Sequence, residues 1–141
     1  MKKVFLFLIF ALIAEHVLNG QIVIVKDGKP SGRIIADLNF KTDKEAADLL
    51  NEFIEKITGT KLPLENPSGK LKPGDIIIRG FGSSTPSDRS LILKEDGFRL
   101  KADGGNLIIT GGPGKGSLYG VVTLLEDYFG VRYYAAGAIN I

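Results

Sequence analysis

Side chains able to perform acid-base or metal chemistry are scarce in this sequence. Its 141 residues include one histidine, His16, and no cysteine. His16 lies in a segment that we expect to be removed, and without it the chain offers no Ser-His or Cys-His pair and no zinc site of the usual ligands. The acidic pairs Glu95-Asp96 and Glu126-Asp127 are adjacent in sequence, which is typical of a turn and a solvated helix end rather than of paired catalytic carboxylates. We therefore expect no catalytic residue, no metal ion and no cofactor.

One glycine-rich segment, GGPGKG at 111–116, is of the kind that binds phosphate between a strand and a helix. A Walker-type loop needs glycine five residues before its Gly-Lys pair and Ser or Thr directly after the lysine. Those two positions hold Ile109 and Gly116. The segment is better explained as a tight strand-to-helix connection, in which glycine allows the backbone to approach closely.

The first 20 residues have the pattern of a secretory signal peptide. Lys2 and Lys3 precede an uninterrupted apolar run at 4–14, and the small Gly20 can precede a cut before Gln21. A cut after the apolar run is the alternative, and a permanent membrane anchor is the other interpretation of the segment. The run is shorter than the about 20 apolar residues of a spanning helix. We expect an exported bacterial protein, periplasmic or extracellular, with no lipid anchor and no membrane contact after cleavage.

Charge and size indicate one small domain that does not bind nucleic acid. Without residues 1–20, which hold Lys2, Lys3 and Glu15, 16 Lys and Arg residues nearly balance 15 Asp and Glu residues, and these basic residues are scattered singly. Proteins that bind nucleic acid usually gather basic residues on one face. Residues 21–141 are enough for one domain that folds without disulfides.

The first part of this domain is expected to contain a hairpin and a helix. Apolar runs at 22–25 and 33–36 flank an Asp-Gly pair, which favours a tight hairpin turn. The segment TDKE at 42–45 matches a capping box and predicts a helix that starts there and ends at Gly59. The apolar residues of this helix fall on one stripe: Ala46, Leu49, Leu50, Phe53, Ile54 and Ile57.

The second part is expected to alternate strands and turns before another helix. The expected extended segments are 62–65, 75–79, 97–101, 107–109 and 131–134, and a surface loop is expected at 80–90. Three consecutive isoleucines in 75–79 indicate a strand at the centre of a sheet. A second amphipathic helix is expected at 117–129, ended by Gly130.

Two helices with one apolar stripe each need only one sheet to cover them. The predicted fold is therefore an α/β two-layer sandwich, with a mixed, mainly antiparallel sheet and two helices packed on one face. The alternative is a doubly wound fold, which would place the helices on opposite faces of the sheet.

Three segments together resemble a known domain. They are AADLLNEFIEKITGTKLPLE (46–65), GDIIIRG (74–80) and DGFRLKADGGNLIITGGPGKGSLYGVVTLLEDYFGVRYYAAGAI (96–139). The matching positions are Gly59, Leu62-Pro63, Gly80, Gly97-Phe98, 107–111, Lys115-Gly116, Tyr119-Gly120, Leu125-Glu126 and Gly130-Val131-Arg132. In this pattern the chain resembles the amino-terminal domain that precedes the catalytic barrel in α-glucuronidases and β-N-acetylhexosaminidases, a hexosaminidase domain-2-like fold. It departs from the pattern at Lys115, Tyr133 and Ala136, where Arg, Trp and Pro are common.

The resemblance implies an accessory role. In such enzymes the catalytic carboxylates lie on the barrel that follows this domain, and a (β/α)₈ barrel takes about 250 residues. Residues 21–141 would then be the non-catalytic N-terminal domain of an exported, α-glucuronidase-like glycoside hydrolase of polysaccharide degradation, packing against a catalytic barrel absent from this chain. The alternative is a free-standing extracellular carbohydrate-binding module that binds polysaccharide without a partner.

Four side chains are candidate contacts with the barrel or with sugar: Arg132, Tyr133, Tyr134 and Tyr119. Aromatic and arginine side chains suit both sugar faces and protein interfaces. The other interpretation of 131–134 is an ordinary edge strand with a buried tyrosine and an ion-paired arginine. The accessory role also predicts an exposed apolar patch where the barrel would sit.

Overall fold

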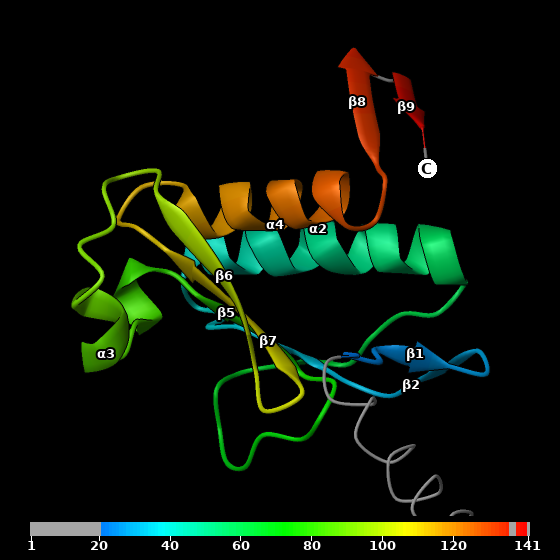
Figure 1. Cartoon of the computed structure of the whole chain (residues 1–141), viewed down its shortest axis with the longest axis horizontal. Coiled ribbons are helices and arrows are strands. Elements are labelled where there is room, and N and C mark those ends of the chain that lie inside the picture. The colour runs from blue at the N-terminus through cyan, green and yellow to red at the C-terminus, as the bar shows by residue number, and fades with distance from the viewer. Residues whose placement is uncertain (1–20, 136–137, 141) are drawn as a thin grey trace, which may run out of the picture.

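The structure is a computed structural model that describes residues 21–135 and 138–140. The expected signal peptide at 1–20 lies outside the described residues. Figure 1 shows a twisted sheet with two long helices side by side above it, and a two-stranded arm that rises beyond the helices. Both long helices cover the same face of the sheet, so the predicted two-layer sandwich is confirmed.

The elements are short except for the two long helices and one hairpin. The strands are β1 (Val25–Lys26), β2 (Lys29–Pro30), β3 (Ile34–Ile35), β4 (Leu64–Glu65), β5 (Ile76–Arg79), β6 (Phe98–Asp103), β7 (Asn106–Gly111), β8 (Arg132–Ala135) and β9 (Ala138–Asn140). The helices are α2 (Lys41–Thr58), α3 (Pro86–Arg89) and α4 (Gly116–Asp127), with a 3₁₀ turn η2 (Phe81–Ser83).

The main sheet has five strands in the order β4-β3-β5-β7-β6. The β3/β4, β3/β5 and β5/β7 pairs are parallel, and only the edge pair β6/β7 is antiparallel. The predicted mixed sheet is confirmed, and β5 lies at its centre as the isoleucine run indicated. Antiparallel pairing is confined to the hairpins, so the expectation of a mainly antiparallel sheet is wrong for the interior. The physical reason is that β3 reaches β4 through the crossover helix α2, which returns the chain in the same direction.

The Asp-Gly turn forms the predicted hairpin but with a different second strand. Asp27 and Gly28 both have positive φ, 52° and 69°, as a tight hairpin turn requires. The strand that follows the turn is Lys29–Pro30, which pairs with β1. Ile34 and Ile35, which we expected to pair across this turn, belong to β3 in the main sheet.

The core lies between the two long helices and one face of the sheet. It gathers Ile34, Ala46, Ala47, Leu50, Phe53, Ile54, Ile76, Ile78, Ile109, Val121, Leu124 and Leu125. The predicted stripe of the first helix is confirmed except at Ile57, which is 41% exposed because the last turn of α2 extends beyond the five-stranded sheet (Figure 1). Gly59 ends α2 with φ of 72°, as predicted.

The predicted capping box at 42–45 is wrong. Helix α2 begins at Lys41, its N-cap is Phe40, and no side chain caps it. Asp43, in the first turn, is fully buried instead. Its carboxylate accepts hydrogen bonds from the Gly80 N–H at 3.0 Å, the Ser83 hydroxyl at 2.7 Å and the Ser117 hydroxyl at 3.0 Å. The side chain that looked like part of a local cap therefore joins α2 to the end of β5 and to the start of α4.

The expected surface loop at 80–90 contains two elements, η2 and α3. A capping box does occur here. The Thr85 hydroxyl accepts from the Asp88 N–H at 3.2 Å, and the Asp88 carboxylate accepts from the Thr85 N–H at 2.9 Å. A Thr-Pro start followed by an acid three residues later is a recognisable helix signal, and it was missed because serine, glycine and proline dominate the segment.

The glycine-rich segment at 111–116 is a tight connection, as predicted. The Gly112 N–H donates to the Gly97 carbonyl at 2.7 Å. A side chain on Gly112 would place its Cβ 2.0 Å from the Lys94 carbonyl oxygen, and one on Gly111 would lie 2.1 Å from the Ser117 nitrogen. Glycine is required here for backbone packing, so the segment needs no bound phosphate to explain it.

The predicted final strand is confirmed as β8, but its partner is β9 rather than the main sheet. Together they form the arm that rises from the end of α4 on the side away from the sheet (Figure 1).

Replacing Asp43 by alanine is expected to destabilise the domain by about 2–4 kcal/mol, because the buried donors of Gly80 and Ser117 and the partly buried Ser83 hydroxyl lose their carboxylate acceptor. The matched control is Asp48→Ala on the same helix, where a half-exposed carboxylate pairs with Lys44; its loss should cost about 0.5 kcal/mol. Urea unfolding at neutral pH measures both. Equal losses for the two variants would contradict the assigned role of Asp43.

Candidate functional site

The predicted contact residue Arg132 lies at the start of β8 and closes the end of α4. Its guanidinium donates to the carbonyl oxygen of Glu126, in the last turn of the helix, and to that of Val131 at 3.1 Å. A cation at this position satisfies a free carbonyl and opposes the negative end of the helix dipole. Among the described residues, the partners of the Arg132 guanidinium are these two backbone carbonyls.

The structure does not bring the four predicted contact residues together. Tyr119 lies in the first turn of α4 and is 42% exposed, whereas Arg132 contacts the last turn of the same helix. The side chains of Tyr133 and Tyr134 lie outside the described part of the chain. Whether these two contact sugar or a barrel stays a prediction.

The outward faces of the two long helices differ in charge. On α2, charged side chains pair with each other along the helix, including Lys44 with Asp48 at 2.5 Å and Lys56 with Glu52 at 2.5 Å. Helix α4 has no charged residue from Gly116 to Leu125. A surface helix normally carries a charged outer face, and an uncharged one is normally covered. Helix α4 therefore has the composition of a buried helix, although Tyr119 on it is exposed.

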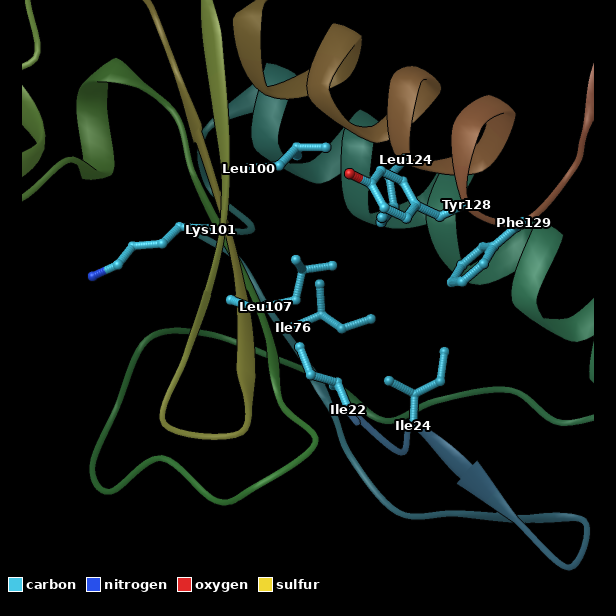
Figure 2. Close-up of a pocket in the computed structure, with 10 residues that line it drawn as sticks. Ile22, Ile24, Ile76, Leu100, Lys101, Leu107, Leu124, Tyr128 and Phe129 are labelled. Carbon is cyan, nitrogen blue, oxygen red and sulfur yellow. The ribbon is translucent and has the colours of Figure 1, made fainter. Parts of the chain in front are cut away.

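A half-open apolar pocket of about 340 Å³ lies under the end of α4. Its lining includes Ile22, Ile24, Leu100, Leu107, Tyr128 and Phe129. Figure 2 shows Tyr128 and Phe129 on one side of the pocket and the two isoleucines of the N-terminal segment below them, with the amino group of Lys101 pointing away. Tyr128 is 72% exposed, so this pocket extends the apolar surface around the end of α4. The sequence placed Tyr128 and Phe129 only in the expected second helix, and the other four residues in expected strands.

A second cluster lies on the face of the sheet that the long helices leave uncovered. Arg79 of β5, Thr110 of β7 and Arg99 of β6 are in register across three strands. The Asp88 carboxylate lies beside this row, 3.4 Å from Nη1 of Arg79 and 3.9 Å from Nη2 of Arg99. Burial favours a higher pKa for Asp88, but hydrogen bonds from Thr85 and the charge of Arg79 outweigh it, and the pKa lies below its ordinary value.

At the opposite end of the strands, Asp75 is fully buried against Arg33. Its carboxylate accepts from Arg33 Nη2 at 2.6 Å and Nε at 3.1 Å, and from the Lys72 N–H at 2.8 Å. The second Nη of Arg33 donates to Glu65 at 2.8 Å. Burial again favours a higher pKa for Asp75, but the donors from Arg33 and Lys72 leave it below the ordinary value.

Within residues 21–135 and 138–140, no group of three or more His, Cys, Asp or Glu residues is placed to hold a metal ion. In the same part of the chain, no helix has the length and apolar character needed to cross a bilayer.

The family model described as Glycosyl hydrolase family 20, domain 2, matches residues 18–126. The chain belongs to this family. Family 20 domain 2 is an accessory domain of glycoside hydrolases, so the hexosaminidase part of the resemblance is confirmed and the link to α-glucuronidases stays a prediction. The match ends at Glu126, before the Gly130-Val131-Arg132 block.

Among solved structures, this family 20 domain 2 chain is similar to a GH138 enzyme targeting pectin rhamnogalacturonan II, with 17% sequence identity and a TM-score of 0.48. The similarity covers 74% of this chain and 11% of that one, so the present chain spans about a tenth of that protein's length. No curated protein matches the sequence.

Acid should weaken this domain through Asp75 and Asp88. Both pKa values lie below the ordinary 3.8, so below that pH the unfolded chain binds more protons than the folded one. Stability is therefore full above about pH 4 and falls as the pH drops toward the native pKa values. Asp88→Asn should lower stability at neutral pH and make the acid-side decrease shallower. Urea midpoints measured from about pH 7 to about pH 2 test this, and parallel curves for variant and parent chain would contradict it.

Proposed function

We propose that this chain is the non-catalytic N-terminal accessory domain of an exported, α-glucuronidase-like glycoside hydrolase, and that it packs against a catalytic barrel. Membership of family 20 domain 2 supports the accessory role. The observation that carries the packing surface is the stretch of α4 from Gly116 to Leu125, which has no charged residue although Tyr119 within it is exposed. The outer face of α2, by contrast, carries charged side chains that pair with each other, and we expect it to stay in water.

The expected interface is centred on α4. Tyr119 is exposed in its first turn, and Tyr128 is exposed just after its last. The apolar pocket under Tyr128 and Phe129 continues this surface toward the N-terminal segment (Figure 2). Large aromatic side chains beside a pocket are the features that anchor protein interfaces.

The buried carboxylates support a non-catalytic role for the domain. Asp43, Asp75 and Asp88 all accept hydrogen bonds from donors of the protein itself. Glycoside hydrolysis needs two carboxyl groups that flank a sugar bond, one of them free to exchange a proton with it. In this proposal, the chemistry belongs to the carboxylates of the barrel.

The substitution Tyr119→Glu tests whether α4 is covered by another domain or exposed to water. In the full-length product of the reading frame that contains this chain, it should reduce stability by about 1–3 kcal/mol, because a charge would be buried in the interface. In the isolated chain the loss should be within about 0.5 kcal/mol, since Tyr119 is exposed there. Asp48→Lys on the solvated face of α2 is the control: it loses the pair with Lys44 and should cost the same small amount, about 0.5–1 kcal/mol, in both proteins. If Tyr119→Glu is equally mild in the full-length protein, α4 is not the interface.

Export is tested by the mass of the mature protein. When the complete chain is expressed in a bacterium, we expect recovery from the periplasm or medium with Gln21 as its first residue, because the apolar run is too short to remain as an anchor. Mass spectrometry of the intact protein distinguishes this cut from the alternative after Ala14. Uncleaved protein retained in the membrane or cytoplasm would contradict export.

A further inference from the structure

A second groove lies on the face of the sheet opposite to the long helices. It is half open and has a volume of about 350 Å³, within the range of ~300–1,000 Å³ in which small-molecule pockets fall. Its apolar part includes Ile35, Ile77 and Leu71, and its polar end is formed by Arg79, Ser83 and Thr85. The two isoleucines alternate along their strands with Ile34, Ile76 and Ile78 of the helix-side core, which places the groove on the other face.

The arginines at this end of the sheet lack full charge compensation. Arg79 and Arg99 share one carboxylate, that of Asp88, at 3.4 and 3.9 Å. The Nε–H of Arg99 is buried and has no acceptor among the described residues. Both guanidinium side chains still reach solvent, with 26% and 37% of their area exposed. The cluster therefore keeps one uncompensated positive charge at the surface.

Arg33 shows what a compensated arginine looks like in this same sheet. It pairs with Asp75 at 2.6 Å and with Glu65 at 2.8 Å. Two carboxylates at short distance occupy the donors of Arg33. Arg79 and Arg99, in contrast, share one more distant carboxylate, so they keep donors available for a ligand.

We propose that this groove binds a carboxylate-bearing sugar unit, with the carboxylate on Arg79 and the ring against the apolar part. A guanidinium can hold a carboxylate by two parallel hydrogen bonds. Arg99 does not line the groove, but it shares the Asp88 carboxylate with Arg79 and so leaves that carboxylate less able to neutralise Arg79. The anionic part of the ligand follows from the arginines, and the sugar part rests on the proposed role in a glycoside hydrolase. An accessory domain with this site would hold an acidic polysaccharide close to the catalytic domain.

Calorimetric titration of the purified chain at low ionic strength tests the proposal. D-Glucuronate is expected to bind with a Kd of about millimolar, as suits a small ligand in an open groove. D-Glucose, its neutral counterpart, should bind at least about tenfold more weakly. Inorganic phosphate tests for an anion site without sugar preference. Phosphate or glucose binding as tightly as glucuronate would overturn the proposal.

Variants locate the site. Arg79→Gln should weaken glucuronate binding about tenfold and Arg99→Gln about threefold, while Arg79→Lys should fall between parent and Arg79→Gln because it keeps the charge but loses the second donor. The control is Arg89→Gln, an exposed arginine next to Asp88, which should change the Kd less than twofold. Equal weakening by Arg89→Gln and Arg79→Gln would overturn the assignment. Far-UV circular dichroism checks folding, and Arg79→Lys carries the test if Arg79→Gln unfolds.

The outcome is independent of the barrel interface. If the parent chain does not bind glucuronate, the proposed ligand site is wrong and the proposed α4 interface is unaffected. If Tyr119→Glu is as mild in the full-length protein as in the isolated chain, the α4 interface is wrong and the proposed ligand site is unaffected, since Tyr119 lies in the helical layer.

Discussion

The buried carboxylate of Asp43 holds the two layers of this domain together. It lies in the first turn of α2 and accepts from the backbone after β5, from η2 and from the start of α4. The positive ends of both long helices therefore converge on one negative charge at the carboxyl ends of the parallel strands. A Cβ on Gly80 would lie 2.2 Å from the Asp43 carboxylate, so the site also requires glycine at the end of the central strand.

This arrangement gives the domain two surfaces of different character. With both helices fixed on one face of the sheet, α2 turns its paired charges to water and α4 presents an uncharged side. The other face carries the cross-strand row Arg79, Thr110 and Arg99 beside a groove. The proposed protein interface and the proposed ligand groove do not compete for one surface, because the sheet separates them.

Local patterns predicted the two long helices, the β6/β7 hairpin and the isoleucine run of β5, since each depends on neighbours within a few residues. They could not predict the Asp43 site, whose partners lie 37, 40 and 74 residues away in the chain. The Thr-x-x-Glu pattern at 42–45 failed for the same reason: burial of Asp43 shifts the helix start to Lys41, which is a tertiary effect. The arginine row likewise depends on strand register, and composition showed only basic residues scattered singly.

Compensation of charge, rather than number of charges, distinguishes Arg33 from Arg79 and Arg99 in this sheet. Arg33, directly before β3, pairs with Asp75, directly before β5, and with Glu65 at the end of β4, so it joins three neighbouring strands. At the other end of the strands, Asp88 is drawn into the capping box of α3 by Thr85, which leaves it at longer distance from Arg79 and Arg99. A carboxylate engaged by a helix cap cannot approach both guanidinium groups closely. The fold of the segment at 80–90 therefore sets how much positive charge stays available at the groove.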